Sequence, residues 1–146
     1  MMPKQITREQ KVCRFHQAME LDVDSQPRVS LLQSRKKLLL EEVFEAVEAI
    51  DILSMEIERG KKGTKEQWAN LLKELADVQY IVSGTVISFN TFPGDFDVVF
   101  NRVHSSNMSK LDNEGKPIHN KDGKVLKGPN YTEPNLTDLI NGGSQL

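Results

Sequence analysis

Residues 38–57, LLLEEVFEAVEAIDILSMEI, decide the fold of this protein, and residues 71–86, LLKELADVQYIVSGTV, give them a partner. In both stretches apolar side chains recur every three or four positions, which is the repeat of an amphipathic helix. Working outward, we expect helices over about 34–59 and 64–92. RGKKG ends the first helix and Pro93-Gly94 ends the second, which predicts an antiparallel pair.

Shorter elements flank this pair. A helix over about 7–20 precedes it, and a helix capped by Asp95 follows it and fades by about 107. From Leu111 onward glycine, proline, asparagine and lysine replace the helical pattern, and no internal repeat is evident. The sequence NKDG at 120–123 is typical of a tight turn, so we expect a small hairpin or an ordered loop there.

The predicted fold is therefore an all-α antiparallel helical bundle. We expect a single domain over 1–146, with a helical core over about 7–107 and a loop or hairpin tail over about 108–146.

Composition narrows the classes of partner. The 146 residues include 19 Lys plus Arg and 21 Asp plus Glu, for a formal net charge of -2, a balance that does not favour nucleic acid or an anionic membrane. No stretch approaches the roughly 18 to 20 apolar residues of a membrane span. The single Cys13 excludes an internal disulfide framework. We expect a soluble, cytoplasmic protein with no nucleic-acid or membrane partner.

Five carboxylates mark the two long helices. Glu41, Glu42 and Glu45 fall within an arc of about 100°, and Glu74 and Asp77 are three positions apart on the next helix. We expect no cation on the same rows, so like charges about 5 Å apart would repel by roughly 3 kcal/mol per pair at an effective dielectric near 20. A divalent cation offsets this repulsion, and oxygen-only ligands select Mg²⁺, Mn²⁺ or Ca²⁺ over zinc.

Two other interpretations of the acids exist. They are ordinary solvated side chains if their helix faces are exposed. A di-iron bundle requires Glu-x-x-His on two helices, and none of His16, His104 and His119 has a glutamate three positions earlier.

A hard cation held by carboxylates suits a polyphosphate substrate. No P-loop sequence is present, so phosphate contacts must come from other groups. Polar and cationic residues downstream are the candidates, unless they only form a solvated loop surface: Arg102, Asn107, Lys110, Lys121, Lys124 and Lys127.

The two acid motifs, EExxE at 41–45 and ExxD at 74–77, resemble the metal-binding signature of the MazG-like all-α nucleoside triphosphate pyrophosphohydrolases. VHSSNMSK at 103–110 and DGKVLKGPNY at 122–131 are similar to the phosphoribosyl-ATP-pyrophosphohydrolase-like branch of that superfamily. With Phe15-His16, the likeness covers about 11–136. It implies Mg²⁺-dependent cleavage between the α- and β-phosphates, with Mn²⁺ as a substitute, by a homodimer or homotetramer.

The resemblance also implies roles for individual residues. The implied metal ligands are Glu42, Glu45, Glu74 and Asp77, and Glu41 would orient or deprotonate the attacking water. Because adjacent helical residues differ by about 100°, the division of roles between Glu41 and Glu42 stays open. The implied phosphate-binding residues are Asn107, Lys110, Lys124, Lys127 and Tyr131, and the base-binding candidates are Phe15 and His16.

The leading hypothesis is a Mg²⁺-dependent enzyme that converts a (d)NTP to the (d)NMP and pyrophosphate in nucleotide-pool control. The preferred base stays open among dUTP, dCTP, dGTP and modified nucleotides. One alternative is hydrolysis of phosphoribosyl-ATP. Another is a non-catalytic, nucleotide- or metal-binding helical interaction module, which ligand would stabilise without turnover.

Overall fold

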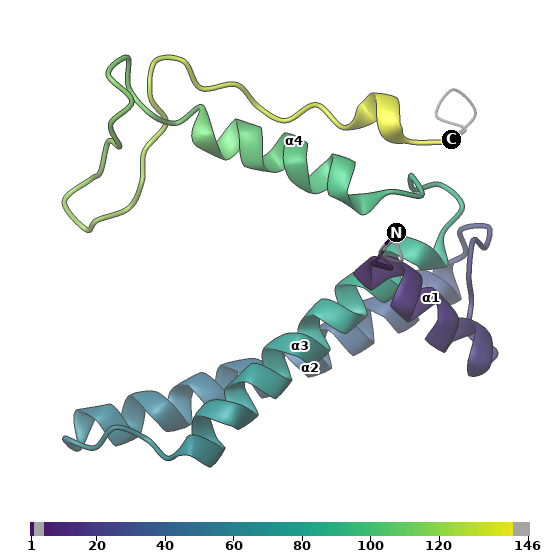
Figure 1. Cartoon of the computed structure of the whole chain (residues 1–146), viewed down its shortest axis with the longest axis horizontal. Helices are drawn as coiled ribbons and strands as arrows, with labels where there is room; N and C mark the ends of the chain where they lie inside the picture. Colours follow the sequence, from purple (N-terminus) through teal and green to yellow (C-terminus); the bar gives the residue numbers. More distant parts are fainter. Residues whose placement is uncertain (2–4, 142–146) are drawn as a thin grey trace. The chain divides into compact units, whose positions relative to one another are not determined.

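The structure is a computed structural model that describes residue 1 and residues 5–141. Its helices are α1 (Arg8–Ala18), α2 (Val29–Glu58), α3 (Lys65–Ser88) and α4 (Phe96–Met108), with a 3₁₀ turn, η1 (Thr137–Leu139) (Figure 1). Within this described part, β structure is limited to isolated bridges. The all-α prediction is therefore confirmed.

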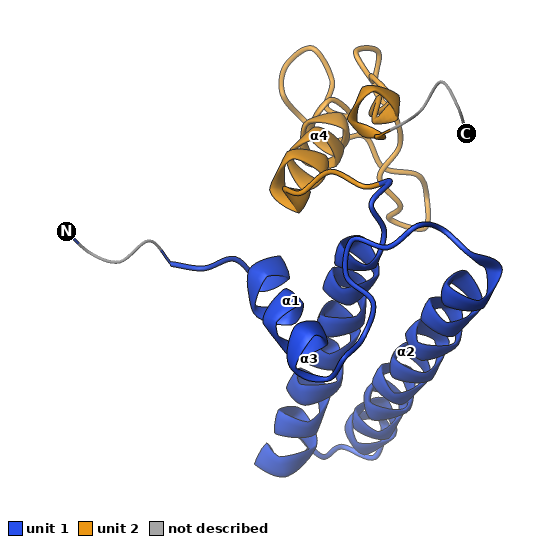
Figure 2. Cartoon of the chain, turned by 90° about the vertical axis from the view of Figure 1, so that its right-hand side faces the viewer, with its two compact units in different colours: residues 1–91 blue, residues 92–146 orange. Residues whose placement is uncertain are grey.

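The chain divides into two compact units, residues 1–91 and 92–146 (Figure 2). The first contains α1, α2 and α3, and the second contains α4 and η1. The boundary lies within the predicted helical core of 7–107. The single domain over 1–146 therefore stays a prediction. Its last residues, 142–146, lie outside the described part of the chain.

The first unit is organised around the pair of α2 and α3, which lie side by side in both views (Figures 1 and 2). The face of α2 that is buried in the unit carries small and branched apolar residues: Leu31, Ala46, Ala49 and Leu53. These positions repeat with the helical period, so one stripe of α2 is removed from water. Ala46 and Ala49 follow Glu42 and Glu45 along α2, so this buried stripe continues directly from the acidic residues.

Two helix boundaries differ from the prediction. Helix α2 begins five residues before Ser34, and α3 ends at Ser88 rather than near residue 92. Backbone pairing explains the second difference: Ser25 N donates to Ser88 O at 2.9 Å, and Asn90 N donates to Ser25 O at 3.0 Å. The connection between α1 and α2 thus competes with the last helical turn of α3. The predicted start at Thr64 is confirmed by a capping box.

Helix α1 is joined to the unit through polar as well as apolar contacts. The His16 side chain is 3% exposed, and its Nδ1 lies 2.8 Å from the carbonyl oxygen of Asp22. The ring lies against Gly84, where a Cβ atom would be 2.9 Å from His16 Nε2 and 2.6 Å from Arg35 Nη2. Arg35 is 7% exposed and donates to the hydroxyl of Thr85 and to a carbonyl of α3. Burial lowers the pKa of Arg35.

The second unit begins with α4, whose predicted cap is confirmed because the Asp95 side chain accepts a hydrogen bond from Asp97 N at 3.0 Å. Farther along, Leu126 N donates to Ile118 O at 2.7 Å across a short hairpin-like loop. The expectation of a small hairpin or ordered loop is therefore confirmed.

Two turns of this unit have the same construction. They are DNEGK at 112–116 and NKDGK at 120–124, eight residues apart. In each, the first side chain accepts backbone hydrogen bonds from the residues two and four positions later, at 2.8–3.0 Å. Gly115 and Gly123 have φ of 76° and 78°, which only glycine adopts at little cost. The two turns share local hydrogen bonding rather than a repeated sequence.

Candidate metal and phosphate site

Three of the five predicted acids come together between α2 and α3. Carboxylate oxygens of Glu42, Glu45 and Glu74 lie within 4.8 Å of one another. Glu74 is buried, Glu42 is half-buried and Glu45 is exposed, so the group extends from the helix interface to the surface. The spacing follows from helix geometry, because positions three apart on α2 project to the same side and face one residue of α3.

The negative charges of this group are only partly balanced by a nearby cation. The negative charge of Glu42, then burial and the contact with Glu74, raise the pKa of Glu45, while Lys73 opposes the shift. Lys73 Nζ lies 3.2 Å from Glu74 Oε1 and 3.0 Å from Asp77 Oδ2. Hydrogen bonds to these two acids raise the pKa of Lys73.

Lys73 also corrects a prediction. The expectation that no cation shares a row with the acids is wrong for α3, because Lys73 and Asp77 form a pair four positions apart. This spacing is visible in the sequence and is the signal that the prediction missed. The Lys73 side chain is 61% exposed, so the charge that it supplies lies at the solvent side of Glu74.

The donor set fits a hard divalent cation. All three side chains of the group offer carboxylate oxygens, the ligand type that Mg²⁺, Mn²⁺ and Ca²⁺ prefer. The raised pKa of Glu45 marks a repulsion that a cation among the three would relieve. Among the residues that the structure describes, this is the group of acids in a geometry suited to such an ion.

The other two predicted acids lie outside the group. Asp77 is paired with Lys73, and Glu41 is exposed and forms an ion pair with Lys37 at 3.8 Å. Glu41 precedes Glu42 by one position and therefore projects about 100° away from it. The roles of Glu41 as base and of Asp77 as ligand stay predictions.

The predicted phosphate-binding residues belong to the second unit. Asn107 Oδ1 accepts a hydrogen bond from Lys110 Nζ at 2.8 Å. Lys127 Nζ lies 4.4 Å from the centre of the Tyr131 ring, a cation–π distance. The side chain of Lys124 is exposed. The structure thus groups these residues as two local pairs and one exposed cation, and their binding of phosphate stays a prediction.

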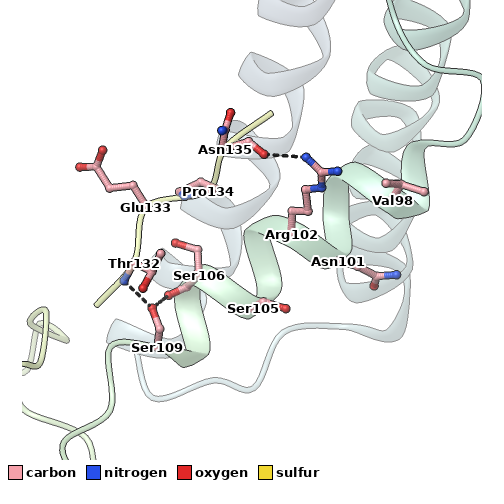
Figure 3. A pocket seen from close by; sticks show the side chains of 10 residues that line it. All are labelled: Val98, Asn101, Arg102, Ser105, Ser106, Ser109, Thr132, Glu133, Pro134 and Asn135. Atoms are coloured by element: carbon pink, nitrogen blue, oxygen red, sulfur yellow. Dashed lines mark hydrogen bonds between the residues drawn. The ribbon is translucent and has the colours of Figure 1, made fainter. Parts of the chain in front are cut away.

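Arg102, a candidate phosphate contact, has a different role in this unit (Figure 3). Its guanidinium donates to the carbonyl of Asn135, as Figure 3 shows. It also donates to both carboxylate oxygens of Asp138, at 2.6 and 2.9 Å. The hydrogen bond with Asp138 raises the pKa of Arg102 and lowers the pKa of Asp138. With the bond from Thr132 N to Ser109 Oγ, this pair fastens the 132–138 segment along α4 beside an open groove of about 740 Å³.

The two base-binding candidates differ in exposure. Phe15 is 39% exposed and makes an edge contact with Tyr80, with the ring centres 5.4 Å apart. His16 is buried and bonded to the backbone. Tyr80, which the sequence prediction did not name, is therefore the aromatic neighbour of the candidate base contact. Contact of Phe15 or His16 with a base stays a prediction.

Comparison with known families bears directly on this site. Residues 12–107 match the phosphoribosyl-ATP pyrophosphohydrolase family. The chain belongs to this family. It is therefore a MazG-like all-α protein of the nucleotide pyrophosphohydrolase kind, and the prediction of a hydrolase is confirmed at that level. The matched segment includes both acid motifs and ends at Asn107.

The comparisons have two further outcomes. No curated protein matches this chain. Within the described part of the chain, no helix has the length and apolar character of a membrane span.

Proposed function

We propose that this protein is a Mg²⁺-dependent pyrophosphohydrolase that converts a (d)NTP to the (d)NMP and pyrophosphate, in the cytoplasm, as part of nucleotide-pool control. The observation that carries this proposal is the convergence of Glu42, Glu45 and Glu74 from two helices of a family member. Three carboxylates that share one small volume are poorly explained as solvated surface acids, since each raises the cost of ionising its neighbours.

In this proposal Glu42, Glu45 and Glu74 hold Mg²⁺ with Asp77, which exchanges its contact with Lys73 for the ion. When bound, Mg²⁺ neutralises charge on the phosphate oxygens and makes water easier to deprotonate. Mn²⁺ substitutes for it, since both ions prefer oxygen ligands.

Glu41 is the proposed base. It is exposed and held only by a 3.8 Å ion pair with Lys37, so its carboxylate is free to turn toward a water molecule. The water oxygen bonds to a phosphorus of the α–β bridge, the bridging P–O bond breaks, and the proton passes to Glu41. If water attacks the α-phosphorus, pyrophosphate leaves with the bridging oxygen. If it attacks the β-phosphorus, the monophosphate leaves with that oxygen, and the two products are the same.

The residues proposed to bind phosphate belong to the second unit. Asn107, Lys110, Lys124, Lys127 and Tyr131 are the proposed contacts, from the same chain or from a neighbouring copy. Lys127 has an ion-pair partner only at 4.0 Å, Glu133, so a phosphate oxygen would replace a weak contact. Phe15 and His16 are the proposed base contacts, with Tyr80 fixing the Phe15 ring.

We further propose that the protein acts as a homodimer or homotetramer. One flank of the α2–α3 pair is apolar and exposed: Leu39, Val43 and Ile50 are 37–46% exposed on α2, and Leu72 is 70% exposed on α3. On both helices these residues lie about 60–160° to the same side of the interface, with Leu72 turned farthest from α2. Exposed apolar side chains gathered on one side of a helix pair often mark an interaction surface, and a second copy would bury them.

Family membership supports a second substrate, phosphoribosyl-ATP. A panel of common NTPs, dNTPs and phosphoribosyl-ATP, each with Mg²⁺ or Mn²⁺ and with products separated by chromatography, decides between the substrates. We expect pyrophosphate and a nucleoside monophosphate. Orthophosphate as the sole inorganic product contradicts the proposal, and thermal stabilisation by ligand without turnover identifies the non-catalytic module instead.

The oligomer has its own test. Ile50→Glu places a charge in the apolar flank, and sedimentation equilibrium should then show a lower mass than for wild type. Glu48→Gln on the exposed polar side of α2 is the matched control and should leave the mass unchanged.

A further inference from the structure

A second cavity lies in the first unit, between α1 and α3. Its volume is about 450 Å³, within the range of small-molecule sites. Helix α1 contributes Arg8 and Lys11, and α3 contributes the apolar Leu75 and Ala76 and the polar Gln79. The residues that line it include two cations and no acid, and among the described residues the one carboxylate in contact with the lining, Glu9, is bonded to Ser83. It therefore lacks the carboxylates that a divalent cation requires.

This cavity is distinct from the acid cluster. At about 100° per residue, Gln79 and Ser83 lie about 140–180° around α3 from Glu74. The two sites therefore face opposite sides of the same helix. A ligand in the α1–α3 cavity therefore lies away from Glu74, on the side of α3 where Tyr80 and Ser83 line the cavity.

A chain of hydrogen bonds fixes the polarity of the cavity wall. Ser83 Oγ lies 3.0 Å from Glu9 Oε1, and a carboxylate only accepts, so the hydroxyl proton must point to Glu9. Ser83 Oγ is then the acceptor for Gln79 Nε2, at 3.1 Å. This orientation leaves Gln79 Oε1 as the amide atom that is available to accept a bond from an N–H group of a ligand.

The charges select the other end of the ligand. Arg8 and Lys11 are exposed on α1 and together supply two positive charges, which match a phosphate monoester of charge -1.5 to -2 near neutral pH. A triphosphate carries more negative charge and would need a metal ion that these residues do not bind. Between the two polar ends, Val12, Leu75 and Ala76 form an apolar surface suited to a flat ring.

We infer that the α1–α3 cavity is a second binding site that takes a nucleoside monophosphate without a divalent cation. The phosphate lies between Arg8 and Lys11, and an N–H group of the base donates to Gln79 Oε1. The choice of a nucleotide rests in part on the proposed function, whose product is such a monophosphate, and the site then provides product feedback from the far side of α3. The cavity, its charge and its acceptor do not depend on that function.

Calorimetric titration of the full chain in EDTA tests this site. The probes are the common ribo- and deoxyribonucleoside monophosphates, ribose 5-phosphate and inorganic phosphate. We expect saturable binding of at least one nucleoside monophosphate that is tighter than binding of ribose 5-phosphate. Arg8→Gln and Lys11→Gln should each weaken it about tenfold, and Gln79→Met should weaken the nucleotide but not inorganic phosphate.

Matched controls separate this site from the proposed active site. Arg14→Gln removes an α1 cation that does not line the cavity and should leave binding unchanged. Glu74→Gln should abolish turnover and keep the EDTA-resistant binding. Lys11→Gln should keep turnover at low product concentration. Absence of metal-free binding, or equal binding by wild type and the Arg8 and Lys11 variants, overturns the inference. Loss of binding in Glu74→Gln also overturns it, because the nucleotide would then occupy the acidic site.

Discussion

The α2–α3 pair contains two polar regions that differ in charge. One is a buried cation bonded to neutral acceptors, and the other is a group of acids of like charge. Around Arg35, a buried cation donates to the hydroxyl of Thr85 and to a carbonyl of α3 and has no recorded acidic partner within the described residues. Seven residues later on α2, about 10 Å along the helix, three acids of like sign converge around Glu42 with one exposed lysine nearby.

The difference distinguishes a structural polar region from a candidate ligand site within one helix interface. The Arg35 region is internally satisfied, since its donors meet acceptors and its neighbour His16 is fixed by the Asp22 carbonyl. The acid cluster is not, because Glu42 raises the pKa of Glu45 and Lys73 serves only the α3 side. A group that opposes its own ionisation yet reaches the surface is typical of a ligand site.

The largest expected effect is on turnover. Glu42→Gln keeps the size of the side chain and removes one ligand charge, so we expect pyrophosphate release to fall more than about 100-fold, beyond the 10–100-fold loss typical of outer-shell partners. The melting temperature should stay equal or rise, because a like-charge repulsion is removed. Glu48→Gln, on the exposed side of α2, is the control. Activity within fivefold of wild type would place the metal elsewhere.

The next largest effect concerns the stability of the hydrogen-bonded region around Arg35. Gly84→Ala inserts a Cβ atom 2.6 Å from Arg35 Nη2 and 2.9 Å from His16 Nε2, and both side chains are already fixed. We expect the free energy of unfolding to fall by about 1–3 kcal/mol. Urea unfolding measures it, with Gly94→Ala as the control because no atom lies within 4 Å of its added Cβ. Equal losses in the two variants would show that the Gly84 contact is unimportant.

A smaller change sharpens the contrast. Arg35→Met keeps a long side chain and removes the buried charge, and the Ile81 carbonyl still accepts from Thr85 Oγ1 at 2.8 Å. We therefore expect the free energy of unfolding to change by less than about 1.5 kcal/mol. A larger loss in urea unfolding would mean that the cation has a counter-charge in the folded protein.

The smallest effect concerns acid. The hydrogen bonds from Arg28 and then Ser25 lower the pKa of Asp22 below its ordinary value of 3.8. Folding therefore gains stability from this carboxylate above its ordinary pKa and loses it as the pH falls through the lowered value. We expect the difference in urea midpoint between wild type and Asp22→Asn to shrink between pH 5 and pH 2.5. A difference independent of pH would contradict this assignment.

Local signals predicted most of the secondary structure. Each of the helix caps depends on residues only a few positions apart in the sequence. The observed caps at Thr7, Thr64 and Asp95 therefore agree with the predicted helix starts. The end of α3 near the Ser25 connection was not predicted, because long-range backbone pairing sets it. The Lys73–Asp77 pair is also local, because its two members are four positions apart on one helix.

The sequence alone determined that the acids form two clusters on two amphipathic helices, because the helical period is a local property. The tertiary structure decided which acids meet. Glu42, Glu45 and Glu74 converge, whereas Glu41 pairs with Lys37. Adjacent helical positions point about 100° apart, and only the packing of α2 against α3 selects the one that faces the interface.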